Sequence, residues 1–543
     1  MGMALIRLLC ILALIRHGLG SGSKHPATIV DTSTTATLSY GTFIGSSDSG
    51  LTQWLGIPYA APPTGSNRFK PPQAPLPLST PLQATATGSW CPQPSKQPVT
   101  NTATPAQSED CLTLNIYAHI NSTTERLPVM VWIHGGSSTT GSGSAPTYNG
   151  INLLNAVSER IVIVTINYRL GVLGWLAGSD MAAAGALNLG LLDQAYALQW
   201  VRTYIGAFGG NASHVTVAGE SAGAVSIGQH LISYNGNQTG FDAAIMESGS
   251  TFSGTAKLPN ATFDQTFFNT FLSNTACAGT TGSAAIIACL RGLTWQDIQA
   301  SQAYASTVAG TASGVGNFHA VIDGSFLTAS PNTLVGNGMV SKVPIIIGTN
   351  TDEGTIFTTV TTEAALSAFI TSISLTLPAG SAATIASLYS SSTYGSPFKA
   401  ASQMFADIAF ICPARALSRT LSARGYNIWR YRFDAYLLSA QAYWNTLGVF
   451  HGSELPYVWN TGLQASESPL GVAIASRWTR FVTYFDPNGA ASNLNGSAWP
   501  KYSGVTGPDQ VFQSTTLPNF TTEPDTANDV NCDFWTSVGA ISD

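Results

Sequence analysis

The sequence predicts an α/β fold in which one mostly parallel sheet is flanked by helices and carries cap insertions. Apolar segments that read as strands alternate with longer stretches compatible with helices; these strands cover residues 129–133, 161–165, 215–218, 243–246, 344–347 and 428–433. Such alternation is typical of a parallel sheet wrapped by helices. Because no low-complexity linker or repeat divides the 543 residues, we expect one domain over residues 21–543. The Ser/Ala/Thr-rich stretch 361–396 is interpreted as a helical cap region.

A tight turn between the predicted strand 215–218 and the helix-like stretch 224–232 carries the most informative motif. Its five residues run from Gly219 to Gly223 in the pattern G-x-S-x-G, with Ser221 at the centre. A serine on such a strand-to-helix turn is pushed out of the backbone, and side chains at the flanking glycines would collide with neighbouring elements. Ser221 is therefore the candidate nucleophile, provided that a base, an acid and an oxyanion hole accompany it.

The order of residues along the chain narrows the choice of base, because the α/β-hydrolase arrangement runs serine, acid, histidine. Five of the eight histidines precede Ser221: His17, His25, His119, His134 and His214. His230 lies on the helix that starts at the turn and points away from the nucleophile's end. Of the two that remain, His451 lies in a glycine-flanked loop and is favoured over His319, which leads into a short strand.

The acid is expected just beyond the β-branched segment 343–347, which reads as a strand buried on both faces. Asp352 and Glu353 follow that strand and precede His451, and spacing alone does not choose between them. The chosen carboxylate would hold the imidazole in the required tautomer and stabilise the imidazolium that forms when Ser221 loses its proton.

The oxyanion hole is predicted directly after the strand that ends at residue 133. Gly135, Gly136 and Ser137 follow it, and small residues there let backbone N–H groups approach a substrate carbonyl closely. Ala222, the residue after the nucleophile, would supply a further N–H group.

With these residues in place, the sequence resembles the type-B carboxylesterase/lipase family, which includes cholinesterases and secreted fungal lipases. The resemblance covers nearly the whole mature chain. Further segments that carry it are residues 56–63 with Arg68 and Phe69, 109–116, 167–171 and 188–194. It implies an α/β-hydrolase fold with cap insertions, and a serine hydrolase that cleaves carboxylic esters through an acyl-serine intermediate without a cofactor.

The resemblance also assigns roles. It makes Glu353, the glutamate of the Asp-Glu-Gly turn, the acid and His451 the base, and it maps two oxyanion donors to Gly136 and Ser137. The chain departs from the family by having Ser137 and Ser138 where relatives usually have a third glycine and a bulky aromatic residue. We therefore expect the N–H group of Gly136 to be a more certain oxyanion donor than that of Ser137. We also expect smaller and more polar side chains to line the acyl side of the pocket.

Cysteine usage indicates an oxidising compartment, because six cysteines remain once Cys10 is removed with a leader. The family pattern implies the pairs Cys91 with Cys111, Cys277 with Cys289, and Cys412 with Cys532. The scattered cysteines show no metal-ligand spacing, so no metal site is predicted.

The first 20 residues read as a secretory signal peptide, with a basic start and an apolar core too short to span a membrane. We therefore expect a secreted, extracellular protein without a transmembrane segment. Six glycosylation sequons support this route: Asn121, Asn211, Asn237, Asn260, Asn495 and Asn519. Because the chain has a formal net charge of −6 and no basic run, its charge does not favour binding of nucleic acid.

The segment between Cys91 and Cys111 bears on the substrate. In relatives that are lipases this loop forms a long amphipathic lid, whereas here it holds four prolines and no aromatic residue. Such a sequence cannot form an amphipathic helix for a lipid surface, which favours an esterase for dispersed small esters over an interfacial lipase. Lipase or sterol esterase activity is the alternative, and a non-catalytic adhesion protein or a serine peptidase is a more distant one. Acyl and alcohol specificity and oligomeric state stay open.

Overall fold

The computed structural model describes residues 34–48, 50–94, 106–119, 125–253, 256–309, 318–375, 377–440, 445–490, 497–504, 507–513, 520–525 and 529–541. The predicted signal peptide lies outside these residues, as do most of the Cys91–Cys111 loop and the sequons at Asn121, Asn495 and Asn519.

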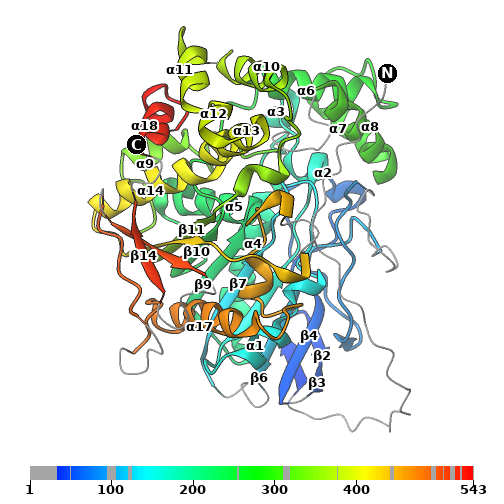
Figure 1. The fold of residues 1–543 in the computed structure, drawn as a ribbon. Helices are drawn as coiled ribbons and strands as arrows, with labels where there is room; N and C mark the ends of the chain where they lie inside the picture. Colours follow the sequence, from blue (N-terminus) through cyan, green and yellow to red (C-terminus); the bar gives the residue numbers. More distant parts are fainter. Residues whose placement is uncertain are drawn as a thin grey trace.

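A large twisted sheet forms the centre of the molecule (Figure 1). Over the described residues it has 11 strands in the order β14-β13-β12-β11-β10-β9-β7-β8-β6-β4-β3. Along the chain these are β3 (Ser46–Asp48), β4 (Leu51–Pro58), β6 (Thr113–His119), β7 (Leu127–Ile133), β8 (Val162–Ile166), β9 (Gly210–Glu220), β10 (Ala243–Glu247), β11 (Ile345–Asn350), β12 (Ile428–Phe433), β13 (Pro508–Phe512) and β14 (Thr521–Pro524). A small separate sheet contains β1 (Thr35–Leu38), β2 (Gly41–Ile44) and β5 (Leu82–Gln83).

The strands from β8 to β13 pair in parallel, whereas β3, β4, β6 and β14 pair antiparallel at the two edges. All six strands predicted from apolar runs are present, within a few residues of the expected bounds except for β9, which begins earlier. The mostly parallel sheet is thus confirmed. The parallel register matters for function because it brings the carboxyl ends of β9, β10 and β11 to one edge of the sheet.

Helices cover both faces of this sheet, and side chains on β7 show how the two faces divide. Val131 and Ile133 pack into the core under α4 and α5, whereas Met130 and Trp132 face the core under α1 and α17. This alternation follows from the two-residue period of a strand. The helices of these layers are α1 (Gly150–Ala156), α4 (Leu189–Tyr204), α5 (Ala222–Ile232), α14 (Cys412–Ala423) and α17 (Ser468–Tyr484).

The cap helices gather at one end of the sheet, at the top of Figure 1. They are α6 (Thr262–Ser273), α7 (Ser283–Gly292), α8 (Trp295–Val308), α10 (Glu363–Ser374), α11 (Ser381–Leu388), α12 (Ser391–Tyr394) and α13 (Pro397–Ala406). Most of the described residues of the stretch 361–396 lie in α10, α11 and α12, as the composition predicted. The remaining helices are short or terminal: α2 (Gly171–Trp175), α3 (Ser179–Ala183), α9 (Pro331–Gly336), α16 (Leu455–Val458) and α18 (Asp529–Ser537).

Three disulfides join the cysteines in the pairs that the resemblance implied. Cys91 bonds Cys111, Cys277 bonds Cys289, and Cys412 bonds Cys532. The third pair links the start of α14 to α18, so it holds the last helix of the chain against the body of the protein (Figure 1).

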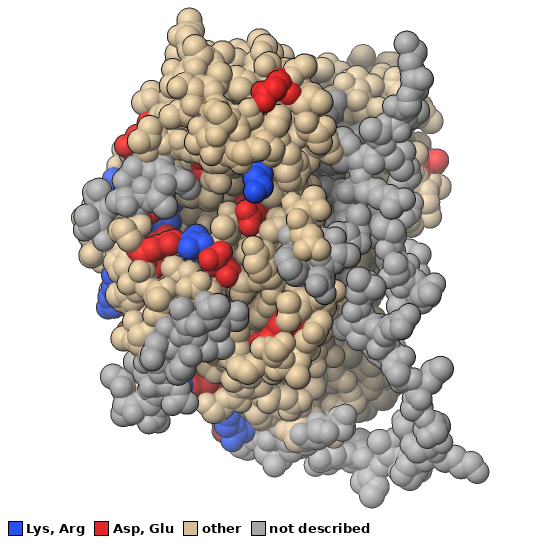
Figure 2. Space-filling view, viewed as in Figure 1, with Lys and Arg blue, Asp and Glu red and all other residues tan. Residues whose placement is uncertain are grey.

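The surface carries few charges, in keeping with a chain in which charged residues make up 9%. On the face seen in Figure 2, the blue and red side chains form only small groups on a mostly uncharged surface. Among the described residues, no helix has the length and apolar character that crossing a bilayer requires.

Candidate functional site

Ser221 occupies a strained turn between β9 and α5. Its backbone angles are φ 54° and ψ −123°, a conformation that non-glycine residues rarely adopt and that is retained where the surroundings enforce it. Its N–H donates to the Glu247 carbonyl at 2.8 Å. A Cβ on Gly219 or Gly223 would come within 2.6 and 2.0 Å of the Ile133 carbonyl oxygen. The structure thus places Ser221 as the G-x-S-x-G motif predicts, with glycines where the chain passes closest to β7.

A buried pair forms between Glu353 and His451, from segments almost 100 residues apart. Glu353 begins the short helix η7 (Glu353–Ile356) just after β11, and its Oε2 accepts a hydrogen bond from His451 Nδ1 at 2.6 Å. Its other oxygen accepts from Ser248 Oγ at 2.5 Å and from the Asn350 N–H at 2.7 Å. The oxygens of this carboxyl group thus accept all three of these hydrogen bonds. With Nδ1–H committed to Glu353, the Nε2 atom is the one left for chemistry.

Asp352, the other carboxylate in this turn, has a different role. Its Oδ2 accepts from the Val449 N–H at 2.8 Å, and its own N–H donates to the Val449 carbonyl at 2.9 Å. Gly448, at φ 67°, is required here because a Cβ would lie 2.1 Å from Asp352 Oδ2. Asp352 therefore stabilises the loop that carries His451, whereas Glu353 forms a hydrogen bond with the imidazole itself.

The carboxylate of Glu220 lies on the other side of the imidazole, with Oε1 3.1 Å from His451 Nε2. Burial raises the pKa of Glu220 to about 7, although the nearby imidazole opposes that change. Burial also lowers the pKa of His451, but Glu220 and Glu353 outweigh it and raise that pKa to about 9. The protonation states of Glu220 and His451 are therefore linked.

Two further buried acids surround this pair. Glu454 accepts a hydrogen bond from Asn350 Nδ2, and burial raises its pKa to about 8. Glu247 accepts from Trp478 Nε1 at 2.7 Å, and burial raises its pKa well above the usual value. Both carboxyls are thus held mainly in the neutral form at pH 7, which leaves Glu353 and Glu220 as the acidic groups in contact with His451.

The Gly135–Ser137 loop lies directly against the nucleophile. A Cβ on Gly135 would be 2.9 Å from Ser221 Cβ, so only glycine permits this approach. Gly136 has φ 106°, and Ser137 takes φ 56° although it is not glycine. The Thr139 and Thr140 N–H groups both donate to the Gly136 carbonyl at 3.0 Å and fix the turn. The N–H groups of Gly136 and Ser137 donate no hydrogen bond to any residue that the structure describes.

An aromatic wall, formed by Phe357, Phe405 and Phe410, adjoins His451. The Phe410 and Phe357 rings lie 4.5 and 5.0 Å from the imidazole, and Phe405 stacks on Phe357 at 4.8 Å. Phe357 and Phe405 are partly exposed. They give one side of the site an apolar lining.

The other histidines considered lie elsewhere. His319 Nε2 is 3.4 Å from Asp264 on α6, and His230 Nε2 pairs with Gln194 at 3.0 Å. No group of three or more metal-ligating side chains occurs among the described residues.

Three of the predicted glycosylation sequons lie in the described residues. Asn211 is partly exposed, and Asn237 and Asn260 are exposed.

Sequence reasoning did not identify Glu220, Glu247, Glu454 or Ser248 as members of this site. Glu220 and Glu454 had a local signal, since one precedes Ser221 and the other follows His451 by three residues. Glu247 and Ser248 reach the site only because β10 pairs with β9 in parallel register, which a sequence does not display.

Several known proteins are similar to this chain in sequence or in fold. The model of the carboxylesterase family matches residues 29–535. The chain is 34% identical over 493 residues to the para-nitrobenzyl esterase of Bacillus subtilis, covering 88% of this chain and 94% of that protein. It is 32% identical over 511 residues to secreted lipase 1 of Botryotinia fuckeliana, covering 85% and 86%. The crystal structure of Aspergillus niger EstA superposes with a TM-score of 0.80 at 28% identity, covering 94% of this chain and 99% of that one.

Replacing Glu220 by glutamine removes a negative charge beside His451 and is expected to lower the pKa of the imidazole. The predicted change is about 1 to 3 pH units, as for other opposite charges at this separation. NMR titration of 13C-labelled histidine would measure it. Glu454→Gln is the matched control, because it replaces a mainly neutral carboxyl and should move the pKa much less. An unchanged or raised pKa in Glu220→Gln would contradict the linkage.

Proposed function

Because this chain belongs to the carboxylesterase family and hydrolyses carboxylic esters, we propose that Ser221, His451 and Glu353 carry out the reaction through an acyl-serine intermediate. The observation that carries this proposal is the 2.6 Å hydrogen bond from His451 Nδ1 to buried Glu353, formed beside the strained turn of Ser221.

In the first step, His451 Nε2 accepts the proton of Ser221 Oγ as that oxygen attacks the ester carbonyl carbon. In the neutral imidazole that acts as the base, Glu353 keeps the proton on Nδ1 so that Nε2 is unprotonated, and it stabilises the imidazolium once it forms. The carbonyl oxygen becomes an oxyanion, and the N–H groups of Gly136, Ser137 and Ala222 receive it. The free N–H groups of the 135–137 loop, lying against Ser221, support this assignment.

In the second half of the reaction, the imidazolium donates its proton to the departing alcohol oxygen as the acyl-serine forms. Water then attacks the acyl carbon as His451 takes its proton, and the imidazolium returns that proton to Ser221 Oγ as the acyl C–Oγ bond breaks and the acid is released. Glu220 lies against Nε2 and adds a second negative charge that stabilises the imidazolium. Every proton transfer in this cycle is carried by side chains of the chain itself.

The disulfide loop supports a preference for dispersed, small esters. Gln93 donates from Nε2 to the Gly141 carbonyl at 3.0 Å, and its Oε1 accepts from the Gly141 N–H at 3.0 Å. The loop thus starts beside the turn that follows the oxyanion residues. Because its composition is polar and rich in proline, it offers no apolar face to a lipid surface. We assign the protein as an esterase that acts on molecules in solution.

The same proposal places the mature protein outside the cell. Three disulfides are favoured by an oxidising compartment, and the leader-like residues 1–20 and the six sequons agree with a secretory route. We propose that residues 21–543 form a single domain.

Ser221→Ala is expected to lower kcat by at least about 10⁴-fold, because the nucleophile and its proton transfer act as one unit. It should also abolish covalent labelling by an organophosphate while leaving the circular dichroism spectrum unchanged. Ser226→Ala, one turn further along α5, is the matched control and should keep both activity and labelling. Hydrolysis at the normal rate by Ser221→Ala would refute the assigned nucleophile.

Rates on a short-chain triglyceride, measured across its solubility limit, test the proposed preference for dissolved esters. The rate is expected to saturate below the limit and to show no jump when droplets form, since no amphipathic lid has to open. A sharp rise at emulsification would show instead that the enzyme acts at interfaces as a lipase.

A further inference from the structure

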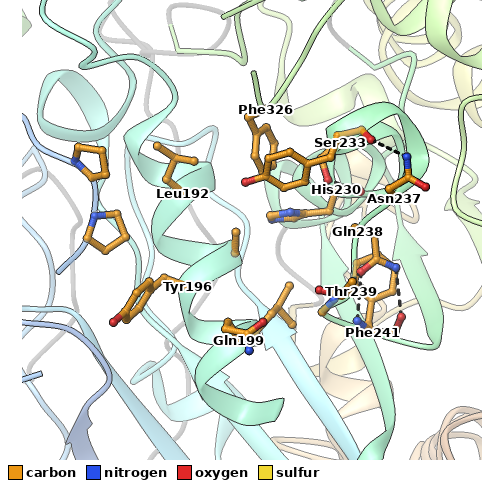
Figure 3. A pocket seen from close by; sticks show the side chains of 16 residues that line it. Leu192, Tyr196, Gln199, His230, Ser233, Asn237, Gln238, Thr239, Phe241 and Phe326 are labelled. Carbon is orange, nitrogen blue, oxygen red and sulfur yellow. Dashed lines mark hydrogen bonds between the residues drawn. The ribbon is translucent and has the colours of Figure 1, made fainter. Parts of the chain in front are cut away.

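A groove of about 390 Å³ lies between α4 and the segment that follows α5. Leu192 and Tyr196 line it from α4, and His230 and Phe326 line the opposite side (Figure 3). Tyr234 also lines the groove. Its volume falls within the range of about 300–1,000 Å³ that is typical of small-molecule sites. His230 and Tyr234 lie at and beyond the carboxyl-terminal end of α5, whereas Ser221 precedes its amino-terminal end, so the groove is separate from the site described above.

The lining of this groove is neutral and mixes aromatic rings with amide groups. None of the described residues that line it is an aspartate, glutamate, lysine or arginine. Burial lowers the pKa of His230 to about 3, so this histidine is uncharged at neutral pH. Aromatic faces bind the polarised C–H bonds of a sugar ring, and amides bind its hydroxyl groups. A neutral carbohydrate suits this lining better than a charged ligand does.

A glycosylation sequon forms part of the groove itself. Asn237, Gln238 and Thr239 all line it, and both Asn237 and Thr239 are exposed. Asn237 Nδ2 donates to the Tyr234 carbonyl at 3.0 Å. An N-linked sugar replaces one of the two hydrogens on that nitrogen, so the other can keep this hydrogen bond. The attachment point of a glycan is thereby held at the groove.

Tyr234 is positioned at a conformational cost. Its φ is 51° and that of Asn235 is 61°, and this left-handed conformation is unfavourable for a tyrosine. The Tyr234 N–H donates to the Phe326 carbonyl at 3.0 Å, and its ring packs edge-on against Phe326 at 5.3 Å. The side chain is nevertheless 46% exposed. A ring held in this way and left open is suited to contact a partner in the groove.

We propose that an N-linked glycan on Asn237 folds back into this groove, with its first sugars stacked on Tyr234 and Tyr196. The glycan would then bridge α4 and the segment after α5. This inference rests on the secretory part of the proposed function, because N-glycans are attached only in that pathway.

The test uses the full-length protein secreted from a eukaryotic host that attaches high-mannose glycans. An endoglycosidase that cuts between the first two sugars is applied to the native protein, and mass spectrometry of glycopeptides follows release at each sequon. Cleavage requires the sugars to leave the groove, so the rate reports how often they do. Release from Asn237 should be about 10-fold slower than from Asn260, given two aromatic contacts. Denaturation should remove this difference.

Two variants test whether the groove is what slows release of the glycan from Asn237. In Tyr196→Ala combined with Tyr234→Ala, release from Asn237 should become about as fast as from the denatured protein, with ester hydrolysis unchanged because neither residue contacts the catalytic site. Tyr304→Ala is the matched control, since this ring on α8 is 50% exposed but lies outside the groove. In this variant, release of the glycan from Asn237 should stay as slow as in the parent protein.

Three results would overturn the proposal. If the glycan on Asn237 were released as fast from the native protein as from the denatured protein, the glycan would not occupy the groove. An unmodified Asn237 in a protein glycosylated at Asn211 or Asn260 would show that the groove has another use. A protein without glycan at any sequon would refute the secretory route as well, and ester hydrolysis by that same protein would leave the catalytic proposal standing.

Discussion

The hydrogen bond between Glu353 and His451 is the interaction on which the rest of the site depends. A carboxylate with no solvent exposure is costly to bury unless hydrogen bonds replace its water. Here the replacements come from three separate segments: Ser248 after β10, Asn350 at the end of β11, and His451 in its loop. They converge only if β10 and β11 keep their parallel register. The register of the sheet therefore brings together the hydrogen-bond donors that stabilise the buried carboxylate of Glu353.

The same turn connects the cap to the sheet. A Cβ on Gly354 would lie 1.8 Å from the Ser402 carbonyl, so η7 packs directly against α13. Phe405 at the end of α13 and Phe410 just after it reach the aromatic wall beside His451. Asp352 accepts a hydrogen bond from the Val449 N–H in the loop that carries His451. The cap is therefore in direct contact with the turn that carries Glu353 and, through the aromatic wall, with His451.

Sequence reasoning succeeded where the signal is local. The strands β7 to β12 are buried on both faces and read as apolar runs, whereas β3, β4, β6, β13 and β14 at the edges were not predicted as strands. The turn at Ser221 could be recognised because its glycines are neighbours in the chain. Spacing could not separate Asp352 from Glu353; the resemblance chose Glu353, and the hydrogen bonds of the two side chains now explain the difference. Glu220, Glu247 and the groove beside Tyr234 depend on distant segments meeting, which no local pattern reveals.

The most direct test of the central claim compares kcat for Glu353→Gln and Asp352→Asn, two neighbouring carboxylates changed in the same way. The account predicts a loss of about 10⁴-fold for Glu353→Gln, because the imidazole loses the partner that sets its tautomer. Asp352→Asn should stay within about 10-fold of the parent, since its backbone hydrogen bond to Val449 remains and only one loop contact is weakened. Near-normal turnover in a folded Glu353→Gln variant, or an equal loss in Asp352→Asn, would contradict it.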